Sequence, residues 1–411
     1  MVNTLRPLYA ASGRPAKPVR LMVGLLILKQ LENLSDERVV EIWVQNPYFQ
    51  AFCGQQRFTW KLPCDPSDLT YFRHRIGEDG VRKIFEVSVT LHGDKAKEEE
   101  VVVDSTVQEK NTTFPTDTKL LTKIVTRFLI MAKLEDVKLR RSYQREIKQL
   151  LRTIRFKSKG RKRAEPQRAV RRLRTIAGVL IREMKRKLSS EALEAHQQSL
   201  GLYDRVQRQQ RSDTGKIYSL HEPDVSCISK GKAHKKYEFG AKASVTVIKI
   251  SGIIVGALSF PDNPFDGHTL PAVLSQVESI VGKRPTTAIC DRCYRGKRRI
   301  GDTRIEIPES GKGPKTENEK RQARARFRRR AAIEPIIGHL RNDHRMLRNY
   351  LKDRIGGSVN LFMACAAFKF REFIRILYFC ASNCWGTFFD RMFRRSGHMP
   401  DGSVLEFFRT D

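Results

Sequence analysis

Three acidic residues stand out by their positions in a chain dominated by basic ones. Asp104 follows the β-branched run VVV, Asp291 follows the run TTAIC, and Glu334 lies within the basic segment RFRRRAAIEPIIGHLR. Three carboxylates placed together repel one another, and hard divalent cations bound between them remove that repulsion. Two Mg²⁺ ions held about 3.5–4 Å apart activate the attacking oxygen and stabilise the leaving oxygen in phosphodiester chemistry.

Two of these residues also have simpler interpretations. An aspartate at a strand end is often a turn or N-cap residue, which is the better interpretation of Asp291 taken alone. Glu334 taken alone is best explained by an ion pair with Arg330, because residues i and i+4 are neighbours on a helix. Spacing alone therefore permits a three-carboxylate site without establishing it.

The charge of the chain indicates its partner. Its 411 residues include 78 Lys and Arg against 45 Asp and Glu, which gives a formal net charge of +33. Such an excess favours a polyanion, so nucleic acid is the leading partner and an anionic membrane the weaker alternative. Apolar stretches such as residues 21–31 are too short to span a membrane, and no signal peptide is visible. The eight scattered cysteines fit a reducing cytosol, so we expect a cytoplasmic, nucleoid-associated protein.

The part of the chain before the first carboxylate is typical of helices. Apolar residues recur at helical spacing from Val23 to Leu34, and Ser35-Asp36 and Asp65-Pro66 are suitable helix starts. We assign residues 1–97 to a helical domain that either contacts DNA or supports the next domain.

The next segments predict a sheet that a helical insertion interrupts. The run EEEVVVDSTVQ indicates one buried strand ending near Asp104, so residues 98–117 form the first part of the sheet domain. Residues 118–212 are basic and helical, and KSKGRKRAEP is expected to turn one long helix back on another. The density of basic residues favours an arm that binds the DNA backbone over a merely solvated face.

Strand character returns after the insertion. Residues 235–261 indicate two strands joined at Ser251-Gly252, and a helix capped by Asp266 follows. Short strands then end at Asp291 and near Pro308. An Arg-rich helical region is expected from about Glu319 to Tyr350.

This order of elements predicts a mixed α/β sheet, interrupted after its first strand, that occupies residues 98–117 and 213–356. Residues 357–411 form a helical tail. Ligands bind at strand ends in open α/β sheets, so Asp104 and Asp291 converge if their strands are neighbours. A helix packed on that edge can add Glu334.

Together these motifs resemble a bacterial insertion-sequence transposase of the DDE class, over nearly the whole chain. VVVDSTVQEKNTTFPTD and CDRCYRG resemble the segments that carry the first two catalytic aspartates, here Asp104 and Asp291. The region from GRPAKPVRL to QAFCG is similar to the amino-terminal domain of these enzymes, and YSLHEPDVSCISKGKAHKKYEFGAK and NPFDGHTL resemble the later strands and helix start. The resemblance implies an RNase H-like mixed sheet with a basic helical insertion and an N-terminal all-helical domain.

The family signature around its glutamate is Tyr, two residues, Arg, three residues, Glu, six residues, Lys. The matching positions here hold Phe327, Arg330, Glu334 and Arg341, near one helical face. The resemblance implies that Glu334 binds metal and that the other three contact DNA near the reacting phosphate. Arg292 and His268 are further expected DNA contacts, and His268 could instead organise a helix start.

The chain departs from the family pattern at three places. Cys293 stands where the family has Gly, and it would be strained if that turn needs a positive φ. Pro335 directly after Glu334 predicts a kinked or restarted helix. The chain also begins close to the first motif, so a leading helix of relatives is expected to be missing.

The resemblance implies a transposase that uses Mg²⁺ or Mn²⁺, with two ions held by Asp104, Asp291 and Glu334. Its partner is double-stranded DNA: it binds terminal inverted repeats, cleaves there and joins 3′ ends to target DNA, as a dimer or larger assembly. Two alternatives stay open, a metal-dependent nuclease of the same fold and a DNA-binding protein with an inactive site. Of these three, only a transposase joins DNA ends to a target, and only the inactive DNA-binding protein lacks metal-dependent chemistry.

Overall fold

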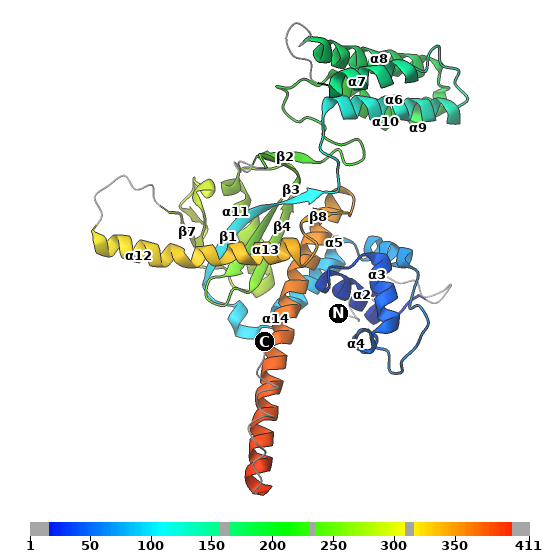
Figure 1. Cartoon of the computed structure of the whole chain (residues 1–411). Coiled ribbons are helices and arrows are strands. Elements are labelled where there is room, and N and C mark those ends of the chain that lie inside the picture. The colour runs from blue at the N-terminus through cyan, green and yellow to red at the C-terminus, as the bar shows by residue number, and fades with distance from the viewer. Residues whose placement is uncertain (1–15, 157–163, 230–234, 309–315, 397–411) are drawn as a thin grey trace.

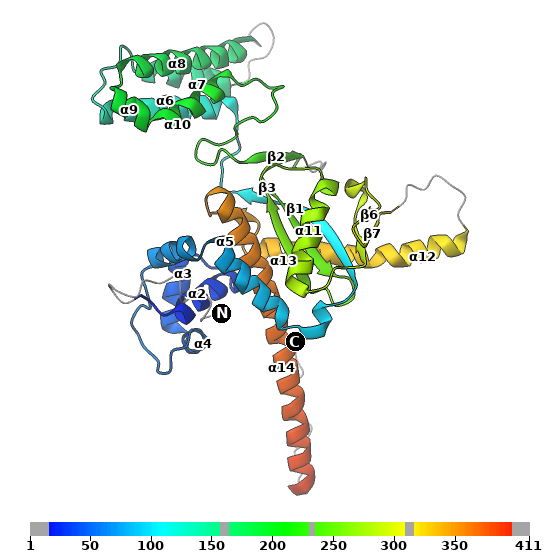
Figure 2. The same cartoon turned by 180° about the vertical axis from the view of Figure 1, so that it is seen from behind.

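The structure is a computed structural model that describes residues 16–156, 164–229, 235–308 and 316–396. Figure 1 shows a central sheet flanked by helices, a separate group of helices at one end, and a long carboxy-terminal helix that projects from the other end. Figure 2 shows the same arrangement from behind, with α11 across the sheet.

The sheet is mixed and centres on β1 (Glu100–Lys110). On one side β1 pairs antiparallel with β3 (Tyr237–Ile248), which pairs antiparallel with β4 (Ile254–Phe260). On the other side β1 pairs parallel with β5 (Thr287–Ile289), which pairs parallel with β7 (Thr303–Glu306). The predicted mixed sheet and the hairpin at Ser251-Gly252 are confirmed.

Three short strands extend this sheet at its margins. They are β2 (Ser226–Ser229), which pairs with β3, β6 (Arg299–Ile300), which pairs with β7, and β8 (Arg348–Asn349), which pairs with β1. The pairing of β8 with the end of β1 brings the chain back to the sheet just before the long carboxy-terminal helix.

The prediction that the first strand ends near Asp104 is wrong, because β1 continues to Lys110. Its second half pairs with β3 as far as Glu109 opposite Gly240. A Cβ atom on Gly240 would lie 2.0 Å from the Gln108 carbonyl oxygen, so only glycine allows the two strands to approach there. Asp104 therefore lies in the middle of a long central strand.

The amino-terminal helices share one hydrophobic core with the sheet. They are α2 (Val19–Leu31), α3 (Asp36–Gln45), α4 (Pro47–Phe52), α5 (Pro66–Thr90) and the 3₁₀ helix η2 (Gly93–Ala96). Leu25, Phe85, Val103 and Ala364 are fully buried members of this core. The first half of α14 (Asp353–Ser396) packs against α5, α2 and β4, while α11 (Asp266–Val281) packs against β4 and β3.

The insertion between β1 and β2 has a hydrophobic core of its own. Its helices are α6 (Asp117–Leu134), α7 (Gln144–Arg155), α8 (Glu165–Lys187), α9 (Ser190–Ala195) and α10 (Gln197–Arg208). The second core contains Leu121, Phe128, Leu173 and Ile176. The expected turn KSKGRKRAEP lies mostly outside the described residues, and the helices on either side of it, α7 and α8, pack against each other.

This separate core predicts that the insertion can be weakened alone. Replacing the fully buried Ile176 with Val is expected to lower the stability of the insertion by about 1 kcal/mol, because one buried methyl group is lost. Hydrogen exchange should quicken for the backbone amides of α6, α8 and α10 and stay unchanged in β1 and β3. Ile130→Val, at a side chain that is 55% exposed on α6, is the matched control. Equal quickening in β1 would show that the two cores unfold together.

The Arg-rich helical region expected from about Glu319 to Tyr350 is broken. The structure has α12 (Glu317–Arg328), a 3₁₀ turn η5 (Arg329–Ala332) and α13 (Ile333–Asn342). The predicted restart at Pro335 is confirmed: this proline lies in the first turn of α13, where its missing N–H would have no helical partner. The 3₁₀ turn η5 therefore alters the relative directions of the side chains on α12 and α13.

Within the described residues, no helix combines the length and the apolar composition that a membrane span requires.

Candidate active site

Asp104 and Asp291 lie side by side because their strands are neighbours. The parallel register of β1 and β5 pairs Val102 with Ile289, and continuing it by two residues places Asp104 beside Asp291. Arg330 lies between the two: its Nη2 atom is 3.6 Å from Asp104 Oδ2 and 3.8 Å from Asp291 Oδ2. Two carboxylates from different strands therefore face one cation.

The remaining oxygens of the two carboxylates bind backbone amides. Oδ1 of Asp104 accepts a hydrogen bond from the Ser105 N–H at 2.8 Å. Oδ1 of Asp291 accepts one from the Cys293 N–H, also at 2.8 Å, and caps the 3₁₀ helix η4 (Arg292–Tyr294). The simpler interpretation of Asp291 as a cap is therefore correct, and the same carboxylate also faces Asp104 across Arg330.

The strain considered for Cys293 does not arise. Arg292, Cys293 and Tyr294 form a 3₁₀ turn, and Cys293 is absent from the described non-glycine residues with positive φ. A side chain at this position is therefore compatible with the turn that carries Asp291.

Buried groups beneath the two aspartates respond to their negative charge. Burial, and then the charges of Asp291 and Asp104, raise the pKa of the Cys290 thiol. Burial, and then the charges of Cys290, Asp266 and Asp104, raise the pKa of Tyr294 well above its usual value. Both groups therefore stay protonated and add no negative charge to the site.

Asp266 is a further acidic residue near this site, and sequence reasoning assigned it a different role. The predicted cap is wrong, because Phe265 occupies the N-cap position of α11 and Asp266 is the first residue of the helix. Oδ1 of Asp266 lies 3.1 Å from Nζ of Lys242 on β3. The packing of α11 against β3 brings Asp266 to Lys242, and the sequence does not show that packing.

Glu334 lies on the exposed side of α13, in the first turn of that helix. The structure does not place it with the two aspartates: in the described part of the chain, no three His, Cys, Asp or Glu side chains are close enough together to hold a metal ion. Among the described contacts it also forms no ion pair with Arg330, which pairs with the aspartates instead.

The other signature residues face the protein. Phe327 is half-buried and packs against the main hydrophobic core. Nη2 of Arg341 lies 3.5 Å from Oε1 of Glu109 and 3.5 Å from Oε1 of Glu238. Both side chains thus have partners within the chain, and their contacts to DNA stay predictions.

Arg292 and His268 are both exposed, and Arg292 directly follows Asp291 in the chain. The His268 ring packs edge-on against Phe265, with 5.5 Å between ring centroids. Arg292 begins a basic stretch directly after Asp291 whose cationic side chains are all exposed, and these are Arg292, Arg295, Lys297, Arg298 and Arg299. Such a surface attracts the phosphates of a nucleic acid, and only Arg292 of it was selected from the sequence.

Comparisons with known proteins agree with this fold. The family model described as Transposase domain (DUF772) matches residues 1–75, and the Transposase DDE domain matches residues 206–368. A stretch of 142 residues is 44% identical to the uncharacterized protein ORF8 in the nfe locus of Rhizobium meliloti, covering 33% of this chain and 69% of that protein. No solved structure gives a significant match.

The mixed sheet with its helical insertion and paired aspartates defines an RNase H-like polynucleotidyl transferase. The chain belongs to the DDE transposases. The predicted fold class, the resemblance and the transposase function are confirmed, and DNA is the partner of the protein.

Enzymes with this domain generally use divalent metal ions. Asp104 and Asp291 fit such an ion, because their carboxylate oxygens already converge on one cationic group and oxygen is the ligand atom that Mg²⁺ prefers. The exposed Glu334 fits only if the start of α13 moves towards them.

Proposed function

We propose that this transposase binds the terminal inverted repeats of its own insertion sequence, cleaves the DNA there and joins the freed 3′ ends to target DNA. Asp104, Asp291 and Glu334 are the proposed ligands of two Mg²⁺ or Mn²⁺ ions. The observation that carries the proposal is the convergence of Asp104 and Asp291 on one cation, beside an exposed basic surface. When bound, the ions would supply activation of the attacking oxygen and stabilisation of the leaving oxygen.

The residues of the chain position the DNA for this chemistry. The exposed basic stretch that begins at Arg292 holds the phosphate backbone beside Asp291, and Arg330 and Arg341 approach the reacting phosphate. His268 and Phe327 contact the DNA on either side of the reacting phosphate. Fixing the phosphodiester against the carboxylates makes the reaction effectively unimolecular, which is where positioning residues contribute most to rate.

The proposed domains divide the remaining work. Residues 1–97 and the basic insertion, residues 118–212, recognise the repeats and hold the backbone. Residues 98–117 and 213–356 form the catalytic core, and residues 357–411 form the tail. Two ends must be brought together before strand transfer, so the active complex is a dimer or larger, and it works in the cytoplasm on the nucleoid.

The test is a cleavage and strand-transfer assay on duplex DNA that carries the element's ends, with a supercoiled target plasmid and Mg²⁺ or Mn²⁺. We expect metal-dependent nicks at the repeat ends and covalent joining of those ends to the plasmid. Nicks without joined products would identify the nuclease of the same fold. Salt-sensitive binding without metal-dependent products would identify the inactive DNA-binding protein.

A further inference from the structure

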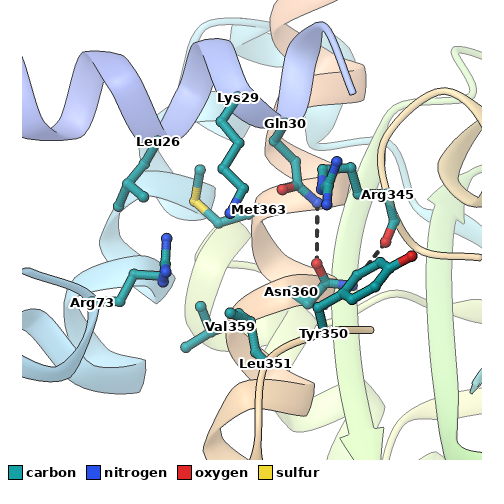
Figure 3. A pocket seen from close by; sticks show the side chains of 10 residues that line it. All are labelled: Leu26, Lys29, Gln30, Arg73, Arg345, Tyr350, Leu351, Val359, Asn360 and Met363. Atoms are coloured by element: carbon teal, nitrogen blue, oxygen red, sulfur yellow. Dashed lines mark hydrogen bonds between the residues drawn. The ribbon is translucent and has the colours of Figure 1, made fainter. Parts of the chain in front are cut away.

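A recess lies where the amino-terminal helices meet the segment that joins α13 to α14 (Figure 3). Three cationic side chains line it: Lys29 from α2, Arg73 from α5, and Arg345 from the loop before β8. Gln30 and Asn360, joined by a hydrogen bond of 3.3 Å, form part of its wall. Nothing in the catalytic site described above uses these groups.

The positive charges in this recess exceed its negative charges. Asp36 lies 2.7 Å from Nζ of Lys29 and accepts two hydrogen bonds, of 2.8 and 2.7 Å, from the guanidinium of Arg73. Among the described residues, Arg345 forms no ion pair, since it donates to the Asn33 carbonyl at 3.1 Å and lies over the Tyr350 ring. Three cations around one carboxylate leave the recess with an excess of two positive charges.

The protonation of Lys29 reflects this imbalance. Burial, and then the charges of Arg73 and Arg345, lower the pKa of Lys29 to about 8. Burial also lowers the pKa of Arg345. The charge of Glu37 acts on Arg345 as well, but this carboxylate is exposed and water screens it. A nearby negative charge favours the protonated ammonium, so an anion in the recess would raise the pKa of Lys29.

The backbone holds Arg345 in place at a conformational cost. Arg345 has φ 60° and Asn33 has φ 55°, a left-handed conformation that is unfavourable for a residue with a side chain. Asn33 donates to the Asn342 carbonyl at 3.0 Å, and Asn360 donates to the Arg345 carbonyl at 3.2 Å. Two strained residues from distant parts of the chain thus fix a guanidinium over the recess.

We propose that this recess binds a phosphate group of the DNA backbone, contacted by Arg345 and Lys29. A guanidinium and an ammonium that line one recess match the oxygens of a phosphate. Tyr350 is 60% exposed at the same recess and offers an aromatic surface to the adjoining sugar or base. Because the recess joins α2 and α5 to the segment beside β8, a phosphate held there links the amino-terminal helices to the catalytic sheet.

This inference rests on the DNA partner of the proposed function. Duplex binding by the full chain, measured by fluorescence anisotropy over a range of salt concentrations, tests it. We expect Arg345→Gln to weaken binding about tenfold and to lower the slope of log Kd against log salt by about one, because one phosphate contact is lost. Lys29→Met is expected to weaken binding and lower the salt slope as well. It provides an independent test if Arg345→Gln fails to fold.

Arg38→Gln is the matched control, because it removes one positive charge from an exposed position on α3. Arg73 is left unchanged, since its pairing with Asp36 supports the fold. If both test variants bind DNA as Arg38→Gln does, with an unchanged salt slope, the proposal is overturned.

A second arm separates free phosphate from the DNA backbone. The melting temperature of the protein without DNA is compared in potassium phosphate and in potassium chloride of equal ionic strength. Stabilisation by phosphate that Arg345→Gln loses, together with unchanged DNA affinity, would assign the recess to free phosphate and overturn the DNA proposal. If wild-type protein fails to bind duplex DNA at all, the proposed function fails, and the phosphate arm still reports on the recess.

Discussion

Replacing Asp104 with Asn is expected to abolish nicking and strand transfer while leaving duplex binding within about twofold of the wild-type value. Asn has nearly the same shape as Asp but no negative charge, so it holds a divalent ion beside Asp291 far more weakly. We expect a loss of at least about 10³-fold in the single-turnover rate, which corresponds to about 4 kcal/mol of transition-state stabilisation. Gel analysis of nicked and joined products, with binding measured on the same DNA, provides both readouts.

Asp94→Asn is the control, because the Asp94 side chain is almost fully exposed on η2 and its substitution removes the same charge. Full activity in Asp104→Asn would remove Asp104 from the metal site. Glu334→Gln in the same assay tests the third proposed ligand. If that variant stays active while Asp104→Asn and Asp291→Asn are inactive, the third carboxylate lies elsewhere, and Asp266 becomes the next residue to replace.

The sequence predicted the succession of strands along the chain from local patterns, and it allowed Asp104 and Asp291 to meet if their strands were neighbours. Buried β-branched runs mark β1 and β3, and a parallel neighbour brings equivalent strand positions together. The length of β1 was underestimated because its second half carries polar residues. Thr106 and Gln108 are nevertheless buried, since β1 is a central strand and other elements cover it. The hydrophobic periodicity and the polarity of a segment cannot by themselves show that polar side chains on a central strand are buried.

The partners of charged residues could not be predicted, because they depend on segments that are distant in the sequence. Spacing on a single helix pairs Arg330 with Glu334, yet the break at η5 turns Arg330 towards the two aspartates. Arg341 lies beside Glu238, which is 103 residues away, and Asp266 at the start of α11 lies beside Lys242 on β3. In each case the packing of a helix or turn against the sheet decides the contact, and that packing is a property of the whole fold.

The position of Arg330 leads to a prediction with two opposite effects. Its guanidinium is the cation that separates Asp104 from Asp291, so a divalent ion must compete with it for the same oxygens. In Arg330→Gln the two carboxylates repel each other without compensation. We expect Mn²⁺ to bind about tenfold more tightly, a change of about 1.4 kcal/mol, in a titration followed by electron paramagnetic resonance.

The same substitution is expected to slow nicking about 100-fold even with Mn²⁺ saturating, because the proposed contact between Arg330 and the reacting phosphate is lost. Arg329→Gln is the matched control, since Arg329 is an exposed neighbour in the same 3₁₀ turn. Unchanged Mn²⁺ affinity in Arg330→Gln would mean that the ion binds away from the two aspartates. Tighter Mn²⁺ binding with normal nicking would mean that Arg330 only holds the carboxylates together before the metal arrives, and that other arginines approach the phosphate.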